Sequence, residues 1–509
     1  MTQFQSTHGV TRAQGDRDAM SGVCVSNRCD ARVRRWLTIA TAGVVVTVAS
    51  CSGSSSTKRH ALLYSSKGKK TVVVPNAGLS KIKHIVMIMQ ENRSFDSYFG
   101  TYPGADGLPK DVTGFSTCLP DPKAKTCVKP YHDPNDVNAG SKHSAAASVT
   151  SVNGGKMDGF VKVARGGQRS YCAKDDLQNP VCTAGDQFDV MGYHDARELP
   201  TYWKYASDYV LQDRMFAPVA SWSLPSHLYM VSAWSALCKN RNVDTCVNNI
   251  VGPYVNGKKI REQVNAVLQQ GKQSPINFAW TNITHLLHQA HVNWGYFIEA
   301  GSEPDCADDE AVCAPVFQTN RTPGIWNPLP LFNDVRNDGE LKKIQDLSAF
   351  RTAAKKGDLP AVSWIVPDQN DSEHPPASIK RGQAWVKSIV DDIMNGPNWD
   401  STAIFVSWDD WGGFYDHVVP PKPDENGYGI RVPGLEISAY AKRGYIDHQT
   451  LSHDAYLKFI EDVFLGGARL DPTTDGRGDA RPSVRENAPI LGDLSKDFDF
   501  TQPPRKPAR

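Results

Sequence analysis

Four short, mostly apolar runs constrain the fold of this chain more than any other feature of the sequence. They lie at residues 81–90, 361–366, 403–408 and 435–440. Runs of this length and composition are typical of strands that are buried on both faces. Helical patterns alternate with them, at about residues 258–270, 340–355, 378–395 and 451–465. Strands that alternate with helices predict an α/β fold with a mainly parallel central sheet and helices on both faces.

Composition and charge narrow the class of protein. Hydrophobic residues make up 40% of the 509 residues and charged residues 22%, which are values for a globular chain. The 56 basic residues nearly balance the 55 acidic ones, so the excess of positive charge expected of a nucleic-acid binder is missing, and we expect no nucleic-acid partner. The region 100–190 is rich in Gly, Pro, Asp, Lys and Cys, which predicts long inserted loops that wall a site.

The N-terminal segment has the pattern of an export signal. A basic stretch ends at Trp36, and the apolar run from Leu37 to Ala49 is shorter than the roughly 20 residues that span a bilayer. We predict a signal peptide with a lipobox over residues 1–51, a tether over 52–80 and one globular domain over 81–509. Lipidation of Cys51 would then hold a periplasmic or cell-surface lipoprotein at the membrane. An ordinary signal of a secreted protein is the alternative, and both Sec and twin-Arg export stay open.

The cysteines also point to export. Eight cysteines follow Cys51, and they fall into four close couples: Cys118 with Cys127, Cys172 with Cys182, Cys238 with Cys246, and Cys306 with Cys313. Short loops between cysteines of an exported chain predict local disulfides, although sequence alone does not fix the pairing. No couple has the CxxC spacing that would favour a zinc site.

Polar residues follow two of the predicted strands. Glu91 and Asn92 come directly after the first strand, and Asp409 and Asp410 follow the strand at 403–408. Ligands of open parallel sheets bind beyond the carboxyl ends of the strands. Carboxylate and amide oxygens together suit a divalent cation, whose identity the sequence leaves open.

Five segments in order along the chain carry a resemblance to a known family. They are residues 85–100, 153–160, the stretch from 191 to 229, 408–421, and the stretch that begins at 431. The first reads Ile-Val-Met-Ile-Met-Gln-Glu-Asn-Arg-Ser-Phe-Asp-Ser-Tyr-Phe-Gly. The chain resembles the bacterial phosphoesterase family of phosphatidylcholine-hydrolysing phospholipases C and acid phosphatases. That family belongs to the alkaline-phosphatase-like superfamily, so the resemblance implies a three-layer sandwich with long inserted loops.

The resemblance also implies roles for particular residues. It assigns four metal ligands, one nucleophile and two histidines that touch the phosphoryl group: Glu91, Asn92, Asp409 and Asp410; Ser223; and His143 and His374. The sequence departs from the family at three positions. Asp410 replaces the more usual Glu, Ser223 stands where phospholipases commonly have Thr and acid phosphatases have Ser, and Trp326 stands where a third histidine is expected.

A serine nucleophile needs activation by a base or by a metal. No Gly-x-Ser-x-Gly elbow surrounds Ser223, so metal activation is the better fit. Pro225 predicts a helix that runs to Trp234, with Ser223 just before its N-terminus, where a phosphate is stabilised. Other residues stay open as alternatives: Ser221 and Ser226 for the nucleophile, and His132, His194, His417 and His453 for the phosphoryl contacts.

The sequence thus favours an exported, metal-dependent phosphoesterase that works through a phosphoserine. A phospholipase C acting on phospholipid diesters is the leading hypothesis, and an acid phosphatase acting on small phosphate monoesters is the alternative. A lipoprotein that keeps the fold but only binds ligands is the hypothesis from another class. Sulfatase chemistry is disfavoured because the segment after Ser223 lacks the Arg of the sulfatase motif.

Overall fold

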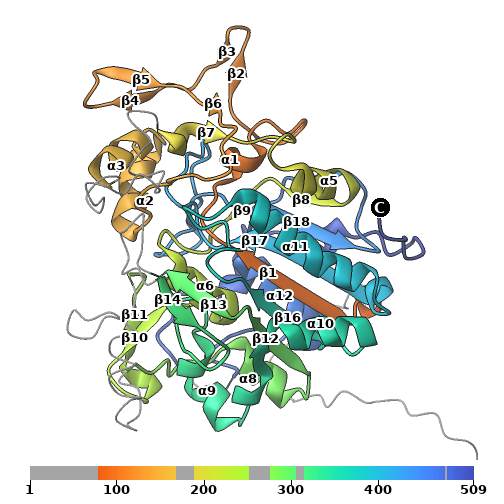
Figure 1. Cartoon of the computed structure of the whole chain (residues 1–509). Helices are drawn as coiled ribbons and strands as arrows, with labels where there is room; N and C mark the ends of the chain where they lie inside the picture. The colour runs from red at the N-terminus through yellow and green to blue at the C-terminus, as the bar shows by residue number, and fades with distance from the viewer. Residues whose placement is uncertain (1–77, 168–187, 252–275, 305–314, 476–477, 509) are drawn as a thin grey trace, which may run out of the picture. The chain divides into compact units, whose positions relative to one another are not determined.

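The computed structural model describes residues 78–167, 188–251, 276–304, 315–475 and 478–508 (Figure 1). The predicted signal peptide and lipobox, most of the tether and the helix at 258–270 lie outside these residues. So do two of the four cysteine couples. None of the helices in the described ranges is both long and apolar enough to span a bilayer.

An eight-stranded sheet forms the centre of the fold. Its order is β15 (Ile344–Asp346), β12 (Trp294–Ile298), β16 (Val362–Val366), β1 (His84–Gln90), β17 (Thr402–Trp408), β18 (Gly434–Ser438), β8 (Val210–Gln212) and β19 (Tyr445–Asp447). β18 runs antiparallel to both of its neighbours, and the other pairs are parallel. No helix lies between β17 and β18, and antiparallel neighbours need no crossover helix. The predicted α/β fold with a mainly parallel sheet is confirmed.

Helices cover the sheet in two groups (Figure 1). One group is α5 (Pro200–Asp208), α10 (Leu347–Lys356) and α11 (Ile379–Met394), and the other is α6 (Ser223–Ser232), α8 (Ile283–Gln289) and α12 (His453–Phe464). Of the four helices predicted between the strands, three lie in the described residues, and all three are present. The one expected from residue 340 begins only at Leu347, because residues 344–346 pair with β12 as the edge strand β15. The short α9 (Asn333–Asn337) packs against α8.

Strand β1 lies in the middle of the sheet and fixes the position of the site. All its residues after His84 are buried, as expected for a central parallel strand. Its register with β17 runs from His84 opposite Thr402 to Gln90 opposite Trp408. The two segments that follow β1 and β17 therefore leave the sheet side by side, and the first begins with Glu91 and the second with Asp409.

The region between β1 and α5 contains more regular structure than the loops predicted for it. It holds α1 (Phe95–Phe99), α2 (Ala145–Val152), α3 (Phe160–Gly167), the hairpins β2 (Lys110–Asp111) with β3 (Gly114–Phe115) and β4 (Leu119–Asp121) with β5 (Thr126–Val128), and the pair β6 (Tyr131–His132) and β7 (Gly192–Tyr193). A second, smaller core includes Phe160, Met191 and Trp411. Because Trp411 belongs to the loop after β17, this core ties the inserted region to the site.

Smaller strand pairs complete the fold. They are β9 (Met215–Phe216) with β20 (Leu451–Ser452), β10 (Ala236–Cys238) with β11 (Cys246–Asn248), and β13 (Gly301–Pro304) with β14 (Pro315–Gln318).

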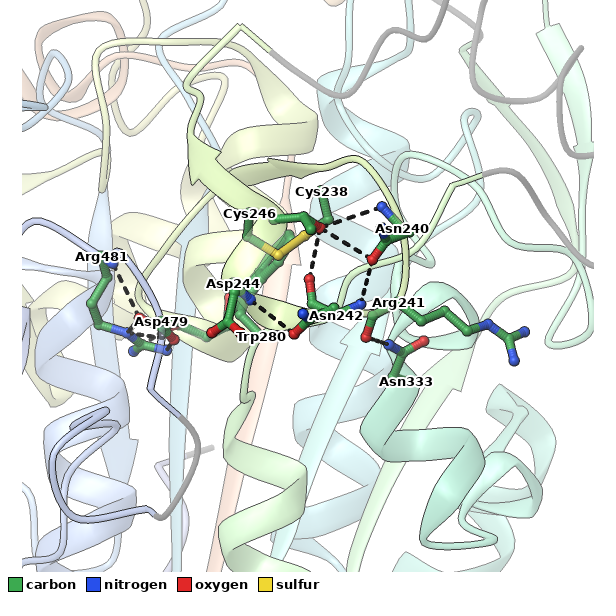
Figure 2. Close-up of a disulfide and its surroundings, with 12 residues drawn as sticks. Cys238, Asn240, Arg241, Asn242, Asp244, Cys246, Trp280, Asn333, Asp479 and Arg481 are labelled. Carbon is green, nitrogen blue, oxygen red and sulfur yellow. Dashed lines mark hydrogen bonds and ion pairs between the residues drawn. A yellow bond between two sulfur atoms is a disulfide. The ribbon is translucent and has the colours of Figure 1, made fainter. Parts of the chain in front are cut away.

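Two of the four predicted disulfides lie within the described residues, and both are present. Cys118–Cys127 closes the β4–β5 hairpin, and Cys238–Cys246 closes β10–β11. Figure 2 shows the second bridge with the loop that it closes, in which Asn242 N–H donates to Asn240 Oδ1 at 2.7 Å. The couples Cys172 with Cys182 and Cys306 with Cys313 lie outside the described residues.

The chain after the β10–β11 hairpin contacts the segment before α6. The hydroxyl of Ser221 donates to the carbonyl of Ile250, and Trp222 Nε1 donates to the carbonyl of Val251 at 2.8 Å. Because Ser223 follows directly, the disulfide-closed hairpin supports the start of the helix that carries the predicted nucleophile.

Candidate active site

The loops that follow β1 and β17 are joined by backbone contacts. Asp409 N–H donates to the Gln90 carbonyl at 3.0 Å, and Asn92 N–H donates to Asp409 Oδ1 at 2.9 Å. The β17 loop turns sharply at Gly412, which has a φ of +58°. A Cβ atom there would lie 2.5 Å from the Asn92 carbonyl oxygen, so only glycine permits this close approach.

The tautomer of His374 determines how the Asn92 amide is oriented. His374 Nδ1 lies 2.8 Å from the Pro375 carbonyl, which only accepts, so Nδ1 carries the proton. Burial lowers the pKa of His374 to about 4, and the ring is therefore neutral at pH 7 with Nε2 as an acceptor. One end of the Asn92 amide is 3.0 Å from Nε2, and this end must be the nitrogen. The amide oxygen then faces Asp409 Oδ1 at 3.3 Å and Asp410 Oδ1 at 3.2 Å.

Buried carboxylates and a histidine adjoin this oxygen cluster. Glu91 Oε1 lies 3.0 Å from His227 Nε2, and ligand atoms of Glu91, His227 and Asp409 all lie within 4.8 Å of one another. Glu91 Oε2 and Asp409 Oδ2 are buried and have no hydrogen-bond partner in the described part of the chain. Sequence reasoning missed His227. The signal was its position four residues after Ser223, which places both on one face of a helix.

Electrostatics favour a cation among these groups. Burial raises the pKa of Glu91 well above its ordinary value, and the charges of Asp409 and Asp410 raise it further. Burial and then Asp409 do the same to Asp410. Burial also opposes the charge of Asp409, but its hydrogen bonds and the nearby His227 hold its pKa below the ordinary value. Clustered buried carboxylates are unfavourable without a counter-charge. Hard oxygen donors with two orphaned atoms fit a divalent cation.

Ser223 is the first residue of α6, rather than the residue before the helix as predicted. Its side chain is buried, and its hydroxyl donates to Asp410 Oδ2 at 3.3 Å. The alternative Ser221 uses its hydroxyl to hold the Ile250 carbonyl, and the buried hydroxyl of Ser226 contacts no polar atom of the described residues. Of the three serines, Ser223 is thus the one hydrogen-bonded to a predicted metal ligand.

The two predicted phosphoryl-contacting histidines lie together. The ring centroids of His143 and His374 are 6.1 Å apart, and His143 Nδ1 lies 2.9 Å from the Ser141 carbonyl. Trp326, which stands where a third histidine was expected, has its ring 6.4 Å from that of His374. All seven predicted site residues are buried; Glu91 adjoins Asp409, and contacts link the other six into one group.

The alternative histidines have other partners. His132 pairs with Glu198 and His194 with Asn138, while His453 contacts the Trp408 carbonyl behind Asp409. His417 pairs with Asp96 at 2.7 Å. Asp96, Asp416 and His417 form a second group with metal-like spacing, but Arg431 already pairs with both carboxylates at 3.1 Å and 2.9 Å. This second group braces the loops after β1 and β17.

Comparison with known proteins decides the family. The profile of the phosphoesterase family matches residues 82–465. The chain belongs to the phosphoesterase family. It is similar to phospholipase C B of Mycobacterium tuberculosis, with 26% identity over 84% of this chain and 79% of the relative. It is also similar to a non-hemolytic phospholipase C of Burkholderia pseudomallei, with 26% identity over 83% of this chain and 59% of the relative. The predicted family membership is confirmed.

Solved structures offer more distant likenesses. A Vibrio parahaemolyticus protein of the alkaline phosphatase superfamily aligns with 82% of this chain and 71% of its own, at 12% identity and a TM-score of 0.33. A sulfatase from Pseudoalteromonas aligns with 83% of this chain and 76% of its own, at 10% identity and a TM-score of 0.34.

Proposed function

We propose that this phosphoesterase is a metal-dependent hydrolase of the phospholipase C type, which cleaves phospholipid diesters through a phosphoserine at Ser223. The observation that carries the proposal is the hydrogen bond from the Ser223 hydroxyl to Asp410, within a buried set of oxygens that includes Asn92 and Asp409. The resemblance to named phospholipases C supports the substrate class.

In the proposed reaction, Ser223 Oγ attacks the phosphorus, so that an Oγ–P bond forms and the P–O bond to the leaving alcohol breaks. Asp410 orients the hydroxyl, accepts its proton as the Oγ–P bond forms, and returns that proton to Oγ when the phosphoserine is hydrolysed. Water then attacks the phosphoserine, releases the phosphate monoester of the headgroup and restores Ser223. Phosphoryl transfer depends mostly on positioning and on stabilisation of charge. A divalent cation held by Glu91, Asn92, Asp409, Asp410 and His227 would supply charge stabilisation at the phosphoryl oxygens and the attacking oxygen.

The two histidines have different parts in this proposal. His143 contacts the phosphoryl oxygens and is the candidate for proton transfer to the leaving oxygen. His374 acts chiefly on Asn92, since its Nε2 accepts from the amide and so directs the amide oxygen toward Asp409 and Asp410.

An acid phosphatase is the second candidate function. The observation that favours it is the serine at position 223, where the sequence resemblance associates Ser with acid phosphatases and Thr with phospholipases. Both candidates use the same site residues, and they differ in whether the phosphorus carries one ester or two.

We also propose that the chain is exported. Two disulfides in the described residues support an oxidising compartment. Lipidation at Cys51, with attachment to the membrane surface, remains part of this proposal and would bring the enzyme to its lipid substrate.

Hydrolysis of two chromogenic substrates tests the proposal. The purified protein would receive a phosphocholine diester or a simple phosphate monoester, with and without chelator, beside Ser223→Ala. Chelator-sensitive cleavage of the diester that the variant lacks is the expected result. Cleavage of the monoester alone would move the assignment to acid phosphatase. Absence of turnover with metals resupplied would favour a ligand-binding protein.

A further inference from the structure

The residue before His374 is a buried acid with an unusual set of partners. Glu373 is fully buried and has a φ of +66°, a left-handed conformation that is strained for a non-glycine residue. Its carboxylate accepts three hydrogen bonds. Tyr202 OH donates to Oε1 at 2.6 Å, and Tyr98 OH and Trp408 Nε1 donate to Oε2 at 2.7 Å and 3.2 Å.

Two of these donors belong to segments of the polypeptide that carry site residues. Trp408 ends β17 and directly precedes Asp409. The Tyr98 hydroxyl accepts from Arg93 Nε at 2.9 Å, and Arg93 Nη1 donates to the Asn92 carbonyl at 3.1 Å. Glu373 itself lies between Ser372, whose carbonyl accepts from Glu91 N–H at 3.0 Å, and His374. A single carboxylate therefore joins the chain segments that follow β1, β16 and β17.

A glycine inside a neighbouring helix leaves room for the Glu373 side chain. Gly382 lies inside α11, where glycine is less favourable than alanine. A Cβ atom at Gly382 would lie 2.2 Å from Glu373 Cγ. Burial also raises the pKa of Glu373 to about 7, although the hydroxyls of Tyr202 and Tyr98 and the charge of Arg93 oppose this shift. A strained backbone, a helix glycine and a buried acid converge on one residue beside the site.

We propose that Glu373 is a positioning residue for the catalytic site, which holds His374 and the loops of Asn92 and Asp409 in register with one another. This inference rests on the proposed function of the site. Loss of the carboxylate removes the contacts that tie the segment of Trp408 and Asp409, the segment of Asn92 and the segment of His374 to one another. The first property to suffer is the affinity of the site for a cation, because the segments after β1 and β17 supply four of its proposed ligands.

The test compares Glu373→Gln with Glu436→Gln. Glu436 is also fully buried, lies on β18 in the same sheet and has a raised pKa, but it contacts none of the site residues through a hydrogen bond of the described chain. Partners of metal ligands typically contribute 10–100-fold to metal affinity or activity. We expect Glu373→Gln to weaken the cation affinity of chelator-treated protein, titrated with Mg²⁺, Ca²⁺, Mn²⁺ and Zn²⁺ in turn, by about tenfold, and to lower kcat by a similar factor.

Tyr202→Phe is a milder variant that tests the same role if Glu373→Gln does not fold. It keeps the carboxylate and two of its donors, and we expect a loss of about threefold in both properties, in line with one neutral hydrogen bond. Wild-type affinity and kcat in a folded Glu373→Gln variant, or equal losses in Glu436→Gln, would overturn the positioning role while the proposed function stands. A wild-type protein that binds none of the four ions and hydrolyses neither substrate would overturn the proposed function first, and this inference with it.

Discussion

Replacement of Gly412 by alanine should damage catalysis far more than it damages the fold. Glycine at this position has a φ of +58°, and an added Cβ would lie 2.5 Å from the Asn92 carbonyl oxygen and 2.7 Å from Asn92 Cβ. Ordinary contact begins at 3.4 Å. The loop of Asp409 and Asp410 must therefore move away from Asn92 by roughly 0.5–0.9 Å. Since a misplacement of about 1 Å can lower a rate about 100-fold, we expect kcat/KM to fall by about 10–100-fold.

Gly339→Ala is the matched control. Gly339 has a φ of +70°, but no atom lies within 4 Å of an added Cβ. Both variants suffer the left-handed strain, about 1–2 kcal/mol of unfolding free energy, and only Gly412→Ala also displaces the site. Steady-state kinetics on whichever of the two chromogenic substrates the enzyme cleaves, with urea unfolding of both variants, separates the two effects. If Gly412→Ala keeps kcat/KM within about twofold of the wild type, the reasoning from loop geometry is refuted.

Three further predictions concern the metal site, a disulfide and a buried acid. His227→Gln should weaken cation affinity of the chelator-treated protein by about tenfold in titration calorimetry, and unchanged affinity would remove His227 from the ligand set. Replacing both Cys238 and Cys246 by Ser should lower kcat as well as the Tm, since that hairpin supports the start of α6. The same change at Cys118 and Cys127 should lower only the Tm, and equal kcat losses in both would contradict the assignment. Burial raises the pKa of Glu486 from 4.5 to about 7, so the folded state holds an extra proton between these values and stability falls as pH rises through this window. The unfolding free energy of Glu486→Gln minus that of the wild type should therefore rise by about 3 kcal/mol from pH 4 to pH 8 in urea melts. A difference that stays constant over this range would contradict the prediction.

The sequence predicted the centre of the fold well because buried parallel strands have a strong local signature. The strands at 362–366 and 402–408 begin within one residue of their predicted positions and end where predicted. The first strand also ends where predicted, at Gln90, but it begins three residues late, at His84. Strand β12 (Trp294–Ile298) was missed, because a five-residue apolar segment without clear punctuation has no distinct period. The antiparallel direction of β18 was also hidden, since direction depends on the connection and on pairing partners far along the chain.

The C-terminal tail shows a different limit of local reasoning. Its polar, proline-rich composition suggests a surface segment, yet Arg485 is buried and pairs with Asp424 and Asp454 at 2.9 Å and 3.0 Å. Charged side chains are buried when they are paired, and pairing between distant segments leaves no trace in composition.

The candidate metal ligands were predictable because they directly follow the ends of two strands. Glu91, Asn92, Asp409 and Asp410 adjoin one another because Gln90 and Trp408 share a register. His227 and Glu373 were not predicted as site residues, since the contacts that place each beside the site are with segments distant in sequence. The orientation of the Asn92 amide needed the tautomer of His374, which only the hydrogen bond to Pro375 reveals.

Direct detection of the covalent intermediate tests most directly whether Ser223 is the nucleophile. A reaction with the phosphocholine diester would be stopped with acid during the first turnover, digested and examined by mass spectrometry, beside Ser223→Ala. We expect a peptide in which Ser223 Oγ carries the whole phosphocholine group, and this modified peptide is missing from the variant. Rapid turnover without modification of that peptide, or with modification at Ser221 or Ser226 instead, would contradict it.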